Sequence, residues 1–126
     1  MTVTNIVRAD QAPRFELPGV EFTALAAPSR GSAHLCTWRI VVAPGLQGQG
    51  HRLDRDEVFH VLSGAVRVTE GGETLRAGDA VTVPAGELIA VSNETDEPAE
   101  MYVAISAGFT ATMDDGTVIG TPPWAL

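Results

Sequence analysis

Apolar and polar residues alternate in short segments along most of the chain, and Gly, Pro and Asp separate these segments at fairly regular intervals. No window of ten or more residues places apolar side chains at the helical spacings of three and four. An alternation with period two puts successive side chains on opposite faces of a strand. The pattern therefore predicts an all-β protein of eight strands, over residues 20–25, 34–42, 58–62, 65–69, 73–76, 80–83, 89–92 and 100–106.

The adjacent glycines Gly71 and Gly72 lie between two of these segments. Glycine adopts positive φ without steric cost, and a two-residue hairpin turn requires this backbone conformation. We therefore expect a two-residue hairpin there. Eight short strands joined by such turns are typical of a double-sheet jelly roll.

The chain has 126 residues, which predicts a single compact domain. Eight basic residues face 16 acidic ones, for a net charge of −8, so nucleic acid and membrane surfaces are poor partners. All eight basic residues are arginines, and the missing lysine excludes Schiff-base and P-loop chemistry. Cys36 is the only cysteine, and the N-terminus lacks a basic start followed by an apolar stretch. These features indicate a cytoplasmic protein.

Two stretches on either side of the hairpin combine turn residues with polar side chains. The first contains Pro44-Gly45, His51, Glu57 and Gly64, with six residues between Glu57 and Gly64. The second contains Gly78-Asp79, Pro84-Ala85-Gly86 and Asn93. Over residues 38–105 the chain resembles the cupin family, whose first motif has Gly, a His-x-His pair, Glu and Gly, and whose second has Gly, Pro-x-Gly, His and Asn.

The resemblance implies a jelly-roll barrel, also called a double-stranded β-helix, with a pocket between its two sheets. A single domain would then span residues 1–126, with an N-terminal arm over 1–19 and a C-terminal extension over 107–126. Family members commonly form homodimers, and free sheet edges favour the same assembly. We expect residues 2–8 or 20–25 to add to the partner's sheet or pack on it.

Family members usually hold a divalent metal through three His and one Glu, and this chain departs from that pattern at two positions. His51 and Glu57 match, but Leu53 replaces the second His and Ile89 replaces the third. Two protein ligands leave most of a coordination sphere to water. We therefore expect no cofactor and no tightly bound metal. If a metal does bind, His51 and Glu57 are its ligands, with His34 or Cys36 as a less favoured rescue.

Leu53 and Ile89 make the centre of the implied pocket apolar, which favours a hydrophobic or aromatic guest. The expected ligand-binding residues are Trp38, Leu53, Phe59, Ile89 and Met101, and Tyr102 is a further candidate. Aromatic and Met side chains on strands are, however, more often plain core. His60 lies three positions after Glu57, so it points to the opposite face.

Glu57 and His51 are the candidate catalytic residues. A buried Glu57 either has a raised pKa or pairs with Arg39, Arg52 or Arg67. His51 could relay a proton near neutral pH.

Three functions remain open. The first is a metal-free pocket that binds or transforms a small apolar or aromatic metabolite. The second is a metal-independent isomerase, cyclase or dehydratase in which His51 and Glu57 transfer protons. The third is a metal-dependent oxygenase with unorthodox ligands, which Leu53 and Ile89 disfavour.

Overall fold

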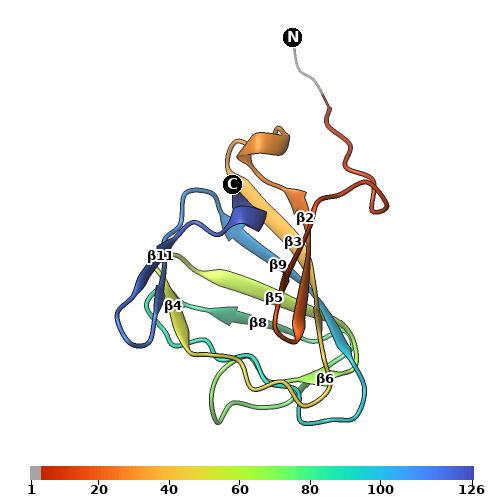
Figure 1. Ribbon diagram of the computed structural model, residues 1–126, viewed down its shortest axis with the longest axis vertical. Coiled ribbons are helices and arrows are strands. Elements are labelled where there is room, and N and C mark those ends of the chain that lie inside the picture. The colour runs from red at the N-terminus through yellow and green to blue at the C-terminus, as the bar shows by residue number, and fades with distance from the viewer. Residues whose placement is uncertain (1–3) are drawn as a thin grey trace.

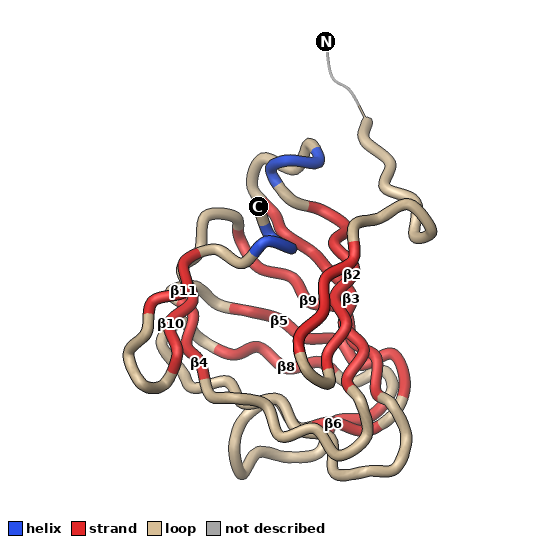
Figure 2. Tube along the Cα trace, in the orientation of Figure 1, coloured by secondary structure: helices blue, strands red, loops and turns tan. Residues whose placement is uncertain are grey.

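The computed structural model describes residues 4–126 and is built almost entirely of strands, as Figure 2 shows. Besides the strands, this range contains two short 3-10 helices, η1 (Pro28–Arg30) and η2 (Pro123–Ala125). The strands are β1 (Arg14–Leu17), β2 (Val20–Ala26), β3 (Leu35–Val42), β4 (His51–Leu53), β5 (Glu57–Ser63), β6 (Ala65–Val66), β7 (Leu75–Arg76), β8 (Ala80–Val83), β9 (Ala99–Ser106), β10 (Ala111–Met113) and β11 (Val118–Gly120). The all-β prediction is confirmed.

A six-stranded sheet in the order β1-β2-β3-β9-β5-β8 forms one wall of the molecule. A three-stranded sheet, β11-β10-β4, faces it across the interior, and β6 pairs with β7 at the end of the barrel (Figure 1). All the pairings are antiparallel. This is the predicted jelly-roll architecture.

The hydrophobic core lies between the two sheets because alternate residues of the long strands point inward. On β3 the buried residues Cys36, Trp38, Ile40 and Val42 alternate with partly exposed ones. The same alternation on β5 and β9 buries a single continuous cluster of apolar side chains. Inward and outward positions therefore follow from strand parity alone.

The prediction of a two-residue hairpin turn at Gly71-Gly72 is wrong. The strands that flank it pair only at Ala65 with Arg76 and Val66 with Leu75, so the connection is a longer loop. Gly71 has positive φ, whereas Gly72 does not. A Cβ at Gly72 would overlap the Thr69 hydroxyl oxygen, so this glycine is needed for close approach rather than for φ.

Residues 89–92 do not form the expected strand. Ile89 makes one isolated bridge, to His51, and Ser92 makes two, to Gln47 and to Arg67. Residues 20–25 form an interior strand of the sheet, because β1 and β3 pair with β2 on its two sides. They cannot add to a partner's sheet by backbone pairing.

The arm that precedes β1 runs away from the barrel (Figure 1). Of the expected dimer segment 2–8, residues 2 and 3 lie outside the described residues. Within 4–126, the structure has no helix long and apolar enough to cross a membrane.

Candidate functional site

His51, on β4 of the three-stranded sheet, is the middle one of three residues that pair side by side. Its backbone pairs with Met113 on one side and with Ile89 on the other. The His51 amide donates to the Ile89 carbonyl at 2.9 Å, and the Ile89 amide donates to the His51 carbonyl at 2.7 Å. Directly paired residues of antiparallel strands share a face. The side chains of Met113, His51 and Ile89 therefore lie side by side.

Leu53 shares this face because it follows His51 by two residues on the same strand, and its partner across the sheet is Ala111. Leu53 is 5% exposed and Ile89 is 1% exposed, so the shared face is the interior one. The two family ligand positions that lack His thus carry aliphatic side chains in the core, beside His51.

Glu57 opens β5 and faces the interior from the opposite sheet. It pairs with Val83 on β8 and with Ile105 on β9, and Ile105 pairs in turn with Cys36. All three apolar neighbours in this row are buried, and Glu57 itself is only 3% exposed. Burial raises the pKa of the Glu57 carboxyl to about 8, so this carboxyl is mostly protonated at neutral pH.

None of the arginines considered as partners for Glu57 pairs with it, so of the two alternatives for a buried Glu57 the raised pKa holds and the arginine pair does not. Arg39 lies 2.7 Å from Glu100, and Arg67 lies 3.0 Å from Glu94. Arg52 donates to the carbonyl of Gly86 at 2.9 Å. Each of these side chains alternates with inward-facing neighbours and therefore points outward.

His51 is partly buried, and its Nδ1 lies 3.3 Å from the carbonyl oxygen of Gln49. Because a carbonyl only accepts, Nδ1 carries the hydrogen in this contact and Nε2 keeps its lone pair. Burial lowers the pKa of His51 more than this hydrogen bond raises it. At neutral pH the imidazole is therefore a neutral base.

The expected aromatic and Met lining residues are all core residues. Trp38, Phe59 and Met101 are each at most 4% exposed, and the Trp38 ring stacks on Phe109 with ring centroids 6.1 Å apart. Trp38 and Phe59 both pair with Val103, one row from Glu57. Met101 lies four residues from Ile105, the partner of Glu57, which is about 13 Å along β9.

Sequence reasoning missed Met113 and Phe109 as neighbours of this region. Both lie beyond the second motif, where Asp114, Asp115 and Gly116 interrupt the apolar alternation. Met113 lies beside His51 because of the register in which β10 pairs with β4, and this register cannot be deduced from sequence spacing.

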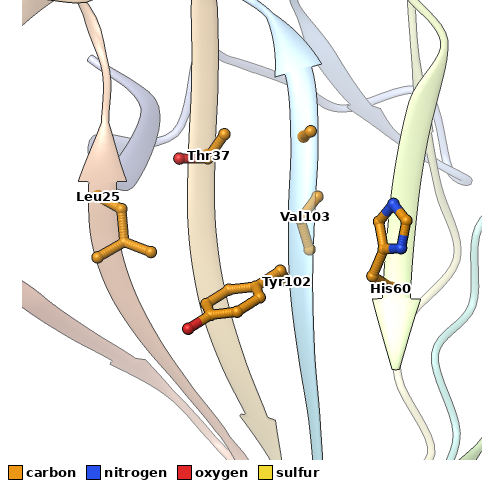
Figure 3. A pocket seen from close by; sticks show the side chains of 6 residues that line it. Leu25, Thr37, His60, Tyr102 and Val103 are labelled. Carbon is orange, nitrogen blue, oxygen red and sulfur yellow. The ribbon is translucent and has the colours of Figure 1, made fainter. Parts of the chain in front are cut away.

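His60 and Tyr102 pair on the outer face of the larger sheet, as Figure 3 shows. With Leu25, Thr37 and Ala104 they line a hollow of about 290 Å³. Tyr102 is 44% exposed, so it does not line the interior as expected. His60 points away from Glu57, in agreement with its position on the strand.

The residues present do not fit the metal centre that the family resemblance implies. His34 is exposed, and the buried Cys36 thiol lies 3.4 Å from the carbonyl oxygen of Ala125. Across residues 4–126, no group of three or more His, Cys, Asp or Glu side chains is arranged to hold a metal ion. His51 and Glu57 provide two donors where a stable site needs three or four.

Several known proteins are similar to this chain. A family model described as a cupin domain matches residues 38–105, more than half of the chain. A protein of unknown function with a cupin-like fold from Ralstonia eutropha JMP134 has a TM-score of 0.65 at 24% identity. The alignment covers 81% of this chain and 64% of that one, so this chain spans less than two thirds of that relative.

Two structures with assigned activities are also similar. A sugar phosphate isomerase from Silicibacter pomeroyi has a TM-score of 0.72 at 23% identity over 86% of this chain and 81% of that one. The polyketide cyclase RemF from Streptomyces resistomycificus has a TM-score of 0.74 at 13% identity over 96% and 89%. No curated protein matches the chain in sequence. The inward-facing His51 and Glu57, the jelly roll and the match over both motifs lead to one conclusion: this chain belongs to the cupin family.

Proposed function

We propose that the chain binds a small apolar or aromatic molecule inside the barrel, next to His51, without a metal. The observation that carries this proposal is the aliphatic pair Leu53 and Ile89, which lies in the interior where the family pattern places imidazoles. A ligand there meets apolar walls and two polar groups, His51 and Glu57. Sites for small molecules typically combine a mostly apolar lining with a few orienting polar groups.

A matched pair of variants on β10 tests this location. Met113 shares the interior face with His51, whereas Thr112 pairs with the outward-facing Arg52. Met113→Trp adds bulk on the interior face beside His51, and Thr112→Trp adds the same bulk on the outer face. With 2-acetonaphthone as the probe in isothermal titration calorimetry, we expect Met113→Trp to lose binding and Thr112→Trp to keep it. Equal binding by both variants would exclude the interior site.

A second candidate function is metal-independent proton transfer, as in an isomerase, cyclase or dehydratase. It is favoured by the opposite pKa shifts of the two polar groups, because Glu57 is held protonated and His51 neutral. Groups whose environments separate their pKa values in this way are suited to acid and base roles. Glu57 would donate a hydrogen bond to a substrate carbonyl oxygen, and Nε2 of His51 would take the proton from the adjacent carbon. The similarity to a polyketide cyclase is compatible with such chemistry.

Hydrogen exchange tests the proton-transfer function directly. The methyl protons of 2-acetonaphthone lie next to its carbonyl, and their exchange in D₂O is followed by NMR. We expect the wild type to accelerate this exchange and both Glu57→Gln and His51→Gln to abolish the acceleration. His60→Gln is the control, since His60 is exposed on the outer face. A wild type that binds the ketone without exchange is a binding protein only.

Metal-dependent oxygenation is not proposed, because the described side chains supply two donors instead of four.

The proposal extends to a homodimer. Tyr102 and the hollow beside it form an exposed apolar area on the larger sheet, on which a second copy could pack. Light scattering at tens of micromolar should give a dimer mass, and Tyr102→Glu should reduce it to a monomer while Tyr102→Phe leaves it unchanged. A monomeric wild type would contradict this assembly.

A further inference from the structure

We propose that the interior site selects uncharged ligands and rejects carboxylates and phosphates of the same shape. This inference rests on the proposed binding function and narrows its ligand class. It follows from the placement of every cationic side chain in the chain.

No arginine has a buried side chain, and the chain contains no lysine. Most of the arginines are held on the surface by partners there: Arg14 by Glu21, Arg30 by Ser29, Arg39 by Glu100, Arg52 by Gly86 and Asp114, Arg55 by Ser106 and Ala107, and Arg67 by Glu94. Arg8 and Arg76 are exposed. The paired arginines could turn inward only by giving up these contacts.

Histidine does not supply the missing positive charge either. His34 and His60 are exposed, and the partly buried His51 has its Nδ1 engaged with the carbonyl oxygen of Gln49 at 3.3 Å. The interior also holds the Glu57 carboxyl, which is either a neutral acid or a negative charge. In the first state it offers an anion one O–H donor but no positive charge, and in the second it repels the anion.

An anion that leaves water needs a charged partner or several hydrogen-bond donors. This interior provides the O–H of protonated Glu57 and the Nδ1–H of His51, and the latter is already directed at the Gln49 carbonyl. A neutral carbonyl or hydroxyl compound needs only one such bond. The charge of a ligand therefore determines whether it binds in the interior before its shape does.

The test uses two pairs of nearly isosteric probes at neutral pH, 2-naphthamide with 2-naphthoate and benzamide with benzoate. We expect the amide of at least one pair to bind the wild type at least about tenfold more tightly than its carboxylate, by isothermal titration calorimetry. Met113→Arg places a cation on the interior face beside His51, and it should reduce or reverse this preference. Thr112→Arg adds the same charge on the opposite face of β10 and should leave the preference unchanged.

The outcomes separate the two proposals. If carboxylate and amide bind the wild type equally well, the charge selection is wrong while interior binding stands. If Thr112→Arg removes the preference as fully as Met113→Arg does, the selection reflects the net charge of −8 and not the interior. If neither amide nor 2-acetonaphthone binds, the proposed binding function fails and the inference fails with it.

Discussion

Ile89 lies directly across from His51, joined to it by two backbone hydrogen bonds of 2.7 and 2.9 Å. The two positions that would carry the first and third imidazoles of a metal site are therefore neighbours in space, although only one is a histidine. Leu53, the position of the second imidazole, is on the same face. The fold therefore brings the family's metal-ligand positions together, but Leu53 and Ile89 stand at two of them in place of histidines.

The double variant Leu53→His, Ile89→His should consequently bind a transition metal. It places three imidazoles on one interior face opposite Glu57, which is the donor set that Ni²⁺, Fe²⁺ and Zn²⁺ prefer. We expect a near one-to-one Ni²⁺ content by elemental analysis, and a loss of this content when His51→Ala is added. Failure of the double variant to bind metal would show that the two motifs are misaligned. A near one-to-one metal content in the unmodified protein would refute the metal-free site.

Glu57→Gln should stabilise the protein increasingly as the pH rises. In the folded wild type the Glu57 pKa is about 8, whereas a free Glu titrates near 4.5, so folding favours the protonated form. Raising the pH from 4.5 through 8 removes wild-type stability on the order of 4–5 kcal/mol, because each pKa unit is worth about 1.4 kcal/mol. Urea unfolding between about pH 5.5 and about pH 8.5 should show the variant's advantage widening. Glu87→Gln, at an exposed position, is the control, and parallel curves for the two variants would contradict a buried Glu57.

Asn93→Ala should destabilise the fold by about 2–4 kcal/mol. The fully buried Asn93 amide donates to the carbonyls of Val42 and Glu97, at 3.3 and 2.7 Å, and its oxygen accepts from Thr95. Removing it leaves a buried carbonyl without this donor and frees the loop that precedes β9. Thr95→Ala, which removes one partner at an exposed position, should lose less in the same urea measurement. Equal losses would show that Asn93 is not the centre of this network.

Trp124→Ala should lower the free energy of unfolding by about 2–4 kcal/mol. Trp124 stacks on Phe22 with ring centroids 3.8 Å apart and lies 6.3 Å from Phe15, so it fixes η2 against β1 and β2. Val118→Ala serves as the control, because Val118 is 68% exposed. If both variants melt at the same temperature, η2 contributes no packing energy.

The sequence allowed the long strands to be predicted because their alternation is regular and their burial follows parity. β3, β5, β8 and β9 lie within one residue of the expected bounds. The short strand β4 was not predicted, because two of its three residues, His51 and Arg52, have no strand preference. β10 was not predicted either, because it forms a strand by pairing with β4 rather than by its own composition.

The same division holds at the site. The inward position of Glu57 and the outward position of His60 follow from period two. The isolation of Glu57 from arginine was not predictable, because it depends on Glu94, Glu100 and Gly86, which hold three arginines elsewhere. Such partners come from distant segments, and their positions emerge only when the sheets are assembled.

The position of β9 between β3 and β5 has a consequence for how the chain folds. Both neighbours precede β9 in the sequence, so until β9 inserts, each presents an open edge of unpaired N–H and C=O groups. These pairings join distant segments, and the entropy of closing the loops must be overcome before the contacts form. Folding should therefore be slow, in the millisecond-to-second range, and a chain arrested before β9 docks would expose two strand edges to aggregation.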